Sequence, residues 1–173
     1  MDIRFLGHAA FELFDGQRRV LIDPFITGNP RAPVGPGDLE RVPRGHQPHP
    51  PPVELDRAST TPKGTVNTPA GMVIRFGGRT VYHLGDTALF SDLALPGARD
   101  ELDVALVCIG GHYTMDRHDA ATAAGLVGAR TVIPCHYDTF PPIETDVEAF
   151  RADVESSTAS DVIVLEPGAS HSL

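Results

Sequence analysis

Two side chains that can bind metal follow apolar runs of β-type residues. Asp86 comes two residues after the run Thr80–Leu84, and His136 comes shortly after the run Thr131–Pro134. Side chains at the carboxyl ends of neighbouring strands meet at one edge of an α/β sheet, where such proteins hold their sites. A carboxylate oxygen and an imidazole nitrogen together suit zinc, iron or manganese. Together Asp86 and His136 indicate a metal site, although each residue taken alone more often has a structural role. An aspartate that caps the next turn and a hydrogen-bonded loop histidine are the structural alternatives.

Other histidines also follow predicted strands or lie near each other. His8 follows the first apolar run and comes directly after Gly7. His112 and Tyr113 follow the long apolar run Val104–Ile109, after two glycines. A structural role stays open for both histidines, because turns with glycine often hold a hydrogen-bonded His. His46 and His49 lie three residues apart among prolines, and ordering such a loop to bind metal would cost conformational free energy.

The elements that position these residues change character along the chain. Short β-type runs joined by turns dominate the first half, at Ile3–Leu6, Phe11–Phe14, Val20–Ile22, Met72–Phe76 and Thr80–Leu84. Buried runs and helical patterns alternate in the second half, at Val104–Ile109, 116–127, Thr131–Pro134, a helix opened by the capping box Thr145-x-x-Glu148, and Val162–Leu165. Hairpins followed by strand–helix–strand units predict a layered α/β protein.

One segment breaks this pattern. Between residues 30 and 69 the sequence predicts neither a strand nor a helix, and residues 31–58 are irregular and rich in proline. A loop of this length without elements of its own is unusual inside a compact domain.

Composition narrows the classes of function. The 173 residues suit a single domain spanning 1–173. The net charge is −9, and the sequence shows no basic patch of the kind that binds nucleic acid through its phosphates, so we expect no nucleic-acid partner. No segment is apolar enough to span a membrane, and the amino terminus resembles a strand more than a signal peptide, so we expect a cytoplasmic protein. Cys108 and Cys135 form no C-x-x-C pair. We expect Cys108 to be a buried core thiol. For Cys135 the same role and a position near the site both stay open, because it adjoins His136.

Several longer motifs carry a resemblance to a known family. They are Phe5-Leu6-Gly7-His8-Ala9-Ala10-Phe11, Leu21-Ile22-Asp23-Pro24-Phe25, Asn67-Thr68-Pro69-Ala70-Gly71, Tyr82-His83-Leu84-Gly85-Asp86-Thr87, Ile109-Gly110-Gly111-His112-Tyr113-Thr114-Met115 and Ile133-Pro134-Cys135-His136-Tyr137-Asp138-Thr139-Phe140-Pro141-Pro142. With them, residues 1–30 and 59–173 resemble the metallo-β-lactamase superfamily, in its branch of small metal-dependent hydrolases related to ascorbate-phosphate lactonases.

The resemblance implies an αββα sandwich with a metal site at one edge of its two sheets. In the family pattern Asp86 matches the bridging carboxylate, His136 matches the last histidine ligand, and Asp23 matches a supporting group beside the site. The implied reaction is attack by metal-activated water on an ester, lactone or phosphoester of a small-molecule substrate. Zinc is the implied metal, with manganese or iron as alternatives, and His112 and Tyr113 are expected to contact the substrate or a developing oxyanion.

The chain departs from the family at one place. The H-x-H-x-D-H motif that supplies most family ligands is absent, and a further family histidine falls at about Arg57. Two matched ligands remain, whereas a catalytic zinc site uses three. We infer an internal deletion that truncates the sandwich in its N-terminal half, either natural or artefactual, such as a shifted reading frame across residues 40–58. The loss would expose a sheet edge, which a second copy of the chain can cover.

Three interpretations therefore stay open at the level of sequence. The chain is a working metal-dependent hydrolase, or a catalytically inactive remnant that binds metal weakly or acts only through protein–protein contact. In the third, a site is rebuilt from His46, His49, Asp86 and His136.

Overall fold

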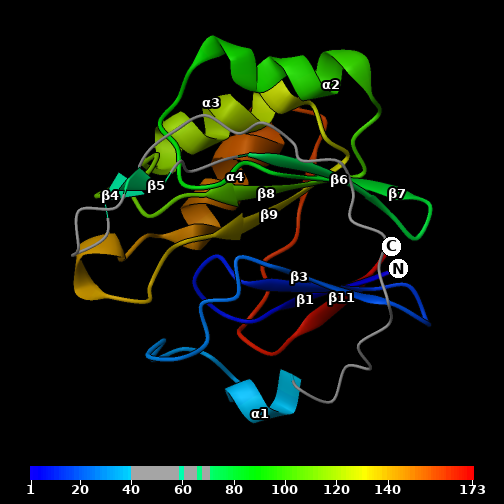
Figure 1. The fold of residues 1–173 in the computed structure, drawn as a ribbon. Coiled ribbons are helices and arrows are strands. Elements are labelled where there is room, and N and C mark those ends of the chain that lie inside the picture. Colours follow the sequence, from blue (N-terminus) through cyan, green and yellow to red (C-terminus); the bar gives the residue numbers. More distant parts are fainter. Residues whose placement is uncertain (40–58, 61–65, 68–70) are drawn as a thin grey trace.

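Two β-sheets lie face to face with helices outside them (Figure 1). The structure is a computed structural model that describes residues 1–39, 59–60, 66–67 and 71–173. The longer helices cover the outer face of one sheet, and the short helix α1 lies beyond the other sheet (Figure 1). The predicted α/β class and its αββα layering are confirmed, and the main core cluster includes side chains from both sheets.

The first sheet is antiparallel and has the strand order β11-β1-β2-β3. Its strands are β1 (Asp2–Phe5), β2 (Phe11–Phe14), β3 (Arg19–Ile22) and β11 (Ser170–Ser172). Ile3, Phe5, Phe11 and Leu13 are buried in the core, as the alternation of the first two strands requires. The three predicted strands of this sheet are confirmed. The sequence analysis missed β11, because its residues Ser-His-Ser include no apolar side chain.

The second sheet has the order β10-β9-β8-β7-β6. Its strands are β6 (Met72–Phe76), β7 (Arg79–His83), β8 (Val104–Cys108), β9 (Thr131–Cys135) and β10 (Asp161–Val162). All pairs are parallel except the β6–β7 hairpin, so the carboxyl ends of β7, β8 and β9 share one edge. All five residues of β8 are buried, as its continuous apolar run predicted. The strand predicted at Val162–Leu165 is shorter than expected.

Two helices begin at aspartate caps. The helix predicted at 116–127 is confirmed as α3 (Arg117–Val127), where the Asp116 side chain accepts hydrogen bonds from two backbone N–H groups and Gly128 ends the helix with φ 66°. The capping box predicted at Thr145 is wrong, because Asp146 caps α4 (Val147–Ser157) by accepting from Ala149 N. The Thr145 hydroxyl donates instead to the carbonyl of Ile109, across the sheet edge.

Smaller elements complete the described ranges. They are α2 (Leu95–Arg99) and the 3-10 turns η1 (Ser91–Ala94) and η2 (Pro141–Ile143). The expectation of no element between residues 30 and 69 is wrong at α1 (Pro36–Leu39), β4 (Ser59–Thr60) and β5 (Val66–Asn67). The predictions for His46 and His49 lie outside the described residues. Both cysteines are buried free thiols. Within the described ranges, no helix has the length and apolarity to cross a membrane.

Candidate metal centre

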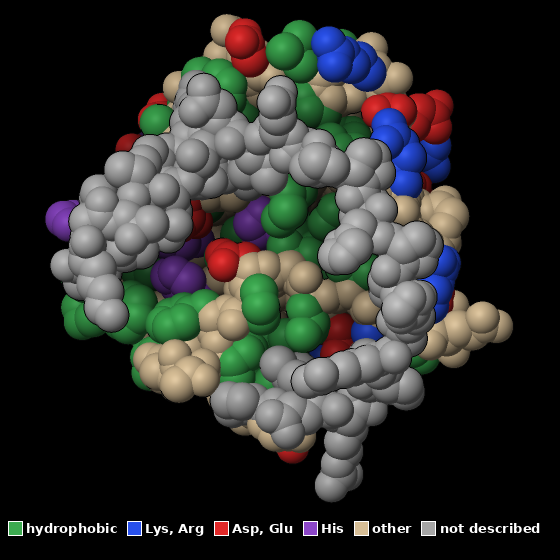
Figure 2. All heavy atoms as spheres, in the orientation of Figure 1, with side chains coloured by type: hydrophobic (Ala, Val, Ile, Leu, Met, Phe, Trp, Pro, Cys, Tyr) green, Lys and Arg blue, Asp and Glu red, His purple; other side chains and the backbone are tan. Residues whose placement is uncertain are grey.

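The two predicted metal ligands lie side by side at the carboxyl edge of the second sheet. Asp86 follows β7 and His136 follows β9, on either side of β8. His136 Nε2 is 3.7 Å from Asp86 Oδ1, and the side chains are 5% and 49% exposed, respectively. Figure 2 shows histidine and acidic side chains in a hollow between the two sheets. One predicted ligand, His136, is therefore buried, while the other, Asp86, is half-exposed.

Two further predicted residues come to the same edge from the first sheet. His8 follows β1 and Asp23 follows β3, and these two strands run in the same direction because both are antiparallel to β2. The centroids of the His8 and His136 rings are 4.1 Å apart. The backbone N–H of His136 donates to the backbone carbonyl of His8 at 2.6 Å. Partial burial raises the pKa of the Asp23 carboxyl, and the negative charge of Asp86 raises it further. The structure thus brings together all four candidates.

The backbone is strained at this edge. In the described part of the chain the non-glycine residues with positive φ are His8 (60°), Asp23 (43°), His136 (56°) and Asp138 (52°). L-residues rarely adopt this left-handed region, at a cost of about 1–3 kcal/mol each. Such strain persists only where the surrounding structure enforces it, and it clusters at functional sites. Three of the four residues are candidates that the sequence had indicated.

His8 is held as a neutral imidazole. Its Nδ1 lies 3.0 Å from Thr139 Oγ1, and the rings of Phe25 and Phe140 approach it at 5.4 and 5.8 Å. Burial, followed by the repulsion of His136, lowers the pKa of His8 to about 4. At neutral pH the ring therefore carries no charge beside His136.

His83 is a histidine of this edge that the sequence analysis did not single out. It is buried, with Nδ1 accepting from Gly85 N at 2.9 Å and Nε2 3.3 Å from the carbonyl of Ala9. Burial lowers its pKa, so the neutral form with the proton on Nε2 satisfies both bonds. Since both nitrogens are used, His83 links the two sheets and offers no lone pair to a metal.

His112 and Tyr113 lie on the loop after β8. Their rings contact each other at 4.5 Å, and Tyr113 is 68% exposed. The loop is joined to the neighbour of Asp86, because Met115 N donates to the carbonyl of Thr87. Substrate contact by His112 and Tyr113 stays a prediction.

The donor pair fits part of a metal site. Two ligands of a tetrahedral zinc ion with bonds near 2.1 Å are about 3.4 Å apart, close to the spacing of Asp86 and His136. The other ring nitrogen of His136, Nδ1, is buried and has no hydrogen-bond partner among the described residues, which costs about 1–3 kcal/mol. Within the described ranges, however, no group of three or more His, Cys, Asp or Glu side chains is arranged to hold a metal ion.

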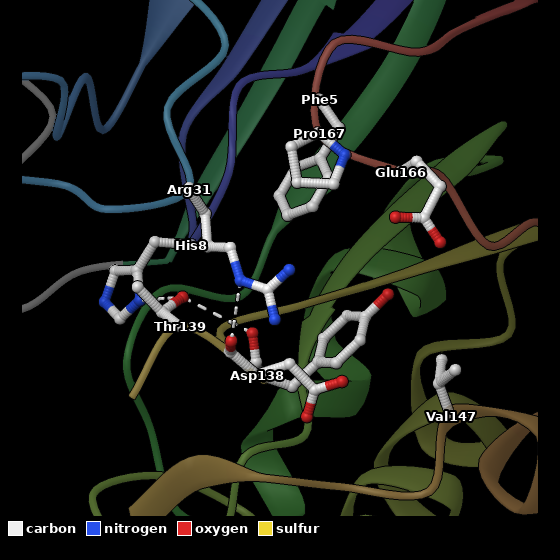
Figure 3. Close-up of a pocket in the computed structure, with 9 residues that line it drawn as sticks. Phe5, His8, Arg31, Asp138, Thr139, Val147, Glu166 and Pro167 are labelled. Carbon is white, nitrogen blue, oxygen red and sulfur yellow. Dashed lines mark hydrogen bonds between the residues drawn. The ribbon is translucent and has the colours of Figure 1, made fainter. Parts of the chain in front are cut away.

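A small cavity lies beside His8, and neither Asp86 nor His136 is among the residues that line it. It has a volume of about 90 Å³, and His8, Thr139, Arg31 and Asp138 are among the residues that line it (Figure 3). Arg31 Nε donates to the carbonyl of Asp138 at 3.1 Å. The sequence analysis missed Arg31, since a single arginine in an irregular segment carries no signal of its own.

Comparison with known proteins agrees with this geometry. The sequence profile of the family described as "Beta-lactamase superfamily domain" matches residues 46–137. A protein of Pelotomaculum thermopropionicum named "UPF0173 metal-dependent hydrolase" is 34% identical over 229 residues, covering 100% of both chains. Igni18, described as a novel metallo hydrolase from the archaeon Ignicoccus hospitalis, has a similar structure, with a TM-score of 0.77 and 27% identity over 98% of this chain and 97% of that one.

A third comparison supports the fold alone. The structure of a putative Zn-dependent hydrolase of the metallo-β-lactamase superfamily from Thermotoga maritima has a TM-score of 0.58 and 22% identity, covering 95% of this chain and 98% of that one. The two facing sheets with outer helices are thus a metallo-β-lactamase fold. The chain belongs to the β-lactamase superfamily, within its family of metal-dependent hydrolases named UPF0173.

Proposed function

We propose that Asp86 and His136 hold a divalent metal, with zinc as the first candidate and manganese or iron as alternatives. The observation that carries the proposal is their 3.7 Å separation at the edge of the sheet, with the His136 ring buried. When bound, such a metal acts as a Lewis acid and lowers the pKa of water, which suits hydrolysis of an ester, lactone or phosphoester of a small molecule.

The residues around the pair fix its geometry. The carbonyl of His8 accepts from His136 N, and β8 separates the two strands that present the donors. The neutral His8 adds no positive charge that would oppose a cation, while the carboxylate of Asp23 lies close enough to interact with both Asp86 and His136. Exposed His112 and Tyr113 are our candidates for contact with the substrate.

The remaining ligands decide between an active enzyme and a remnant. The alignment with the Pelotomaculum relative runs over 229 residues although the chain has 173, so part of that relative has no counterpart here. This supports an internal deletion that removed the H-x-H-x-D-H motif. The absence of a third ligand within the described ranges favours the alternative, an inactive remnant that binds metal weakly or acts through protein–protein contact. The remaining alternative is a metal site that His46 and His49 complete. A single cytoplasmic domain and a homo-oligomer that covers an open sheet edge stay predictions.

Metal content is the test. Purified protein is stripped with a chelator, reloaded with zinc or manganese, and analysed for bound metal by elemental analysis. We expect retention in the parent protein and loss in Asp86→Asn and His136→Gln. The matched controls Asp92→Asn and His118→Gln change exposed residues on η1 and α3 and should retain metal. Retention in Asp86→Asn and His136→Gln would refute the ligand assignment, and no retention in the parent protein would favour the remnant.

A separate variant tests whether His46 and His49 complete the metal site. If His46 and His49 complete the ligand set, replacing both with Gln should lower the metal stoichiometry as much as Asp86→Asn does. If metal is retained in that double variant, the third ligand lies elsewhere. A screen of ester, lactone and phosphoester substrates is then run on whichever form binds metal.

A further inference from the structure

The cavity beside His8 contains a guanidinium group without an opposite charge bound to it. Arg31 Nε donates to the carbonyl of Asp138, and among the described residues its side chain makes no other hydrogen bond (Figure 3). Nine ion pairs join other residues, but among the described residues no carboxylate lies within 4.0 Å of the Arg31 nitrogens. Two N–H-bearing nitrogens of its planar fork therefore remain available to a ligand.

The backbone of Arg31 is held in place from two sides. A Cβ atom on Gly7 would lie 3.0 Å from the Arg31 carbonyl oxygen, so the close approach of these two segments depends on glycine at this position, whose φ is +89°. On the other side, the buried Asn29 accepts from Arg31 N at 2.9 Å and donates to the carbonyl of Phe25 at 2.9 Å. The guanidinium thus starts from a fixed backbone, which reduces the entropy lost when it binds a partner.

We infer that Arg31 binds an oxyanion of the substrate, a carboxylate or a phosphate, while the bond to be hydrolysed lies on the other side of His8. This rests on the proposed function, because it makes Arg31 a specificity-determining residue of the same site. The fork of a guanidinium matches two oxygens of either anion. His8 lines the cavity and its ring also contacts the ring of His136, so the same side chain borders both binding places. A cavity of about 90 Å³ admits only a small group, such as the charged end of a larger molecule.

Two other residues of the cavity bear on the affinity of an anion. Tyr137 lines the cavity, and its phenol hydroxyl can donate a hydrogen bond to an oxyanion. Glu166 also lines the cavity, where its own charge opposes an anion (Figure 3). Removing the charge of Glu166 should therefore strengthen anion binding, while removing that of Arg31 should weaken it.

The test uses metal-free, full-length protein and needs no turnover. Sodium acetate and inorganic phosphate are titrated separately at constant ionic strength. The backbone N–H signals of the cavity residues Asp138 and Thr139 are followed by NMR in every variant, together with the Arg31 Nε–H signal in the proteins that retain Arg31. The variants are Arg31→Gln, Arg31→Lys and Glu166→Gln. Arg130→Gln is the matched control, because Arg130 is an exposed arginine paired with Glu101 near the amino end of β9.

We expect a saturable shift of the Arg31 signal with at least one anion, and the anion that binds more tightly identifies the group. The Kd should rise about tenfold in Arg31→Gln, which corresponds to about 1.4 kcal/mol, and should fall in Glu166→Gln. Arg31→Lys should bind more weakly than the parent protein if the fork matters, and it serves in place of Arg31→Gln if that variant does not fold. An Arg31 signal that does not respond to either anion, or an unchanged Kd in the folded Arg31 variants, would overturn the inference. Because no metal is present, this result is independent of whether Asp86 and His136 bind one.

Discussion

Replacing Gly110 with alanine should displace the backbone of His136 in the candidate metal centre. Gly110 follows β8, between the strands that present Asp86 and His136. A Cβ atom at this position would lie 2.1 Å from the carbonyl oxygen of His136 and 2.9 Å from Cβ of the fully buried Ile143. The nearest obstacle is backbone, so no flexible side chain can turn away to make room.

The distances set the size of the effect. A carbon–oxygen contact is normally about 3.3 Å or longer, so the His136 backbone must move by about 1.2 Å. Overpacking of this kind costs about 1–3 kcal/mol, and two rigid neighbours favour the upper end. For a chain of this length, about 3 kcal/mol lowers Tm by about 6–12 °C. A shift of about 1 Å in His136 also spoils a donor pair whose spacing is now close to that of two ligands on one zinc ion.

The control variant is Gly97→Ala, which introduces an equally short contact with a backbone carbonyl away from the site. A Cβ atom on Gly97, in α2, would lie 2.1 Å from the carbonyl oxygen of Val127, in α3 on the outer helical layer. Thermal unfolding followed by circular dichroism should show a large loss of Tm in both variants. Competition with a chromophoric zinc chelator should show weakened metal binding in Gly110→Ala alone. A parent-like Tm in Gly110→Ala would refute the packing argument. Parent-like zinc affinity in a destabilised Gly110→Ala would refute the link between this backbone and the metal.

Three further predictions follow from individual contacts. Asp116→Ala removes the side chain that accepts from His118 N and Asp119 N, so the free energy of unfolding should fall by about 1 kcal/mol in urea denaturation without a change in zinc affinity. A larger loss would mean that Asp116 does more than cap α3. Asn29→Ala leaves the Arg31 N–H and the Phe25 carbonyl unpaired, which should cost about 2 kcal/mol and weaken acetate or phosphate binding in the same NMR titration. Unchanged anion affinity would show that Asn29 does not position Arg31. In metal-free protein, the pKa of His8 is lowered from 6.5 to about 4, so the unfolded chain binds a proton in this window that the folded chain does not. The free energy of unfolding should fall as the pH drops from 6.5 to 4, by about 2 kcal/mol after screening at this partly exposed ring, and His8→Gln should remove that part of the slope. An identical slope in His8→Gln would contradict the assignment.

Much of the site's position could be predicted from local sequence. A residue that follows a buried parallel strand is placed at the carboxyl edge by the strand itself, and this was enough for Asp86 and His136. His8 and Asp23 follow strands of the other sheet. The Gly7-His8 turn indicated His8, whereas Asp23 was indicated by the family resemblance alone. The apolar run of β8 likewise predicted a strand that is buried on both faces.

Other features depend on contacts between distant segments and leave no local pattern. Arg31 reaches its position through Gly7 and through the carbonyl of Asp138, which is 107 residues further along the chain. Thr145 fits a capping box locally, but its hydroxyl donates to Ile109 and Asp146 becomes the cap. The strand β11 forms because its backbone pairs with β1, although its side chains are polar.

The strained backbone shows which part of the site the described fold maintains by itself. His8, Asp23 and His136 all have positive φ, and the contact that links His8 to His136 is made by described residues. Strain of this kind must be offset by the structure around it, and the hydrogen bond from the backbone N–H of His136 to the His8 carbonyl is part of that structure. A third metal ligand is missing from the described ranges, so tight metal binding would require a contribution from residues outside them or from another copy. The measured metal affinity therefore reports on those residues, whereas its loss in Asp86→Asn and His136→Gln reports on the pair.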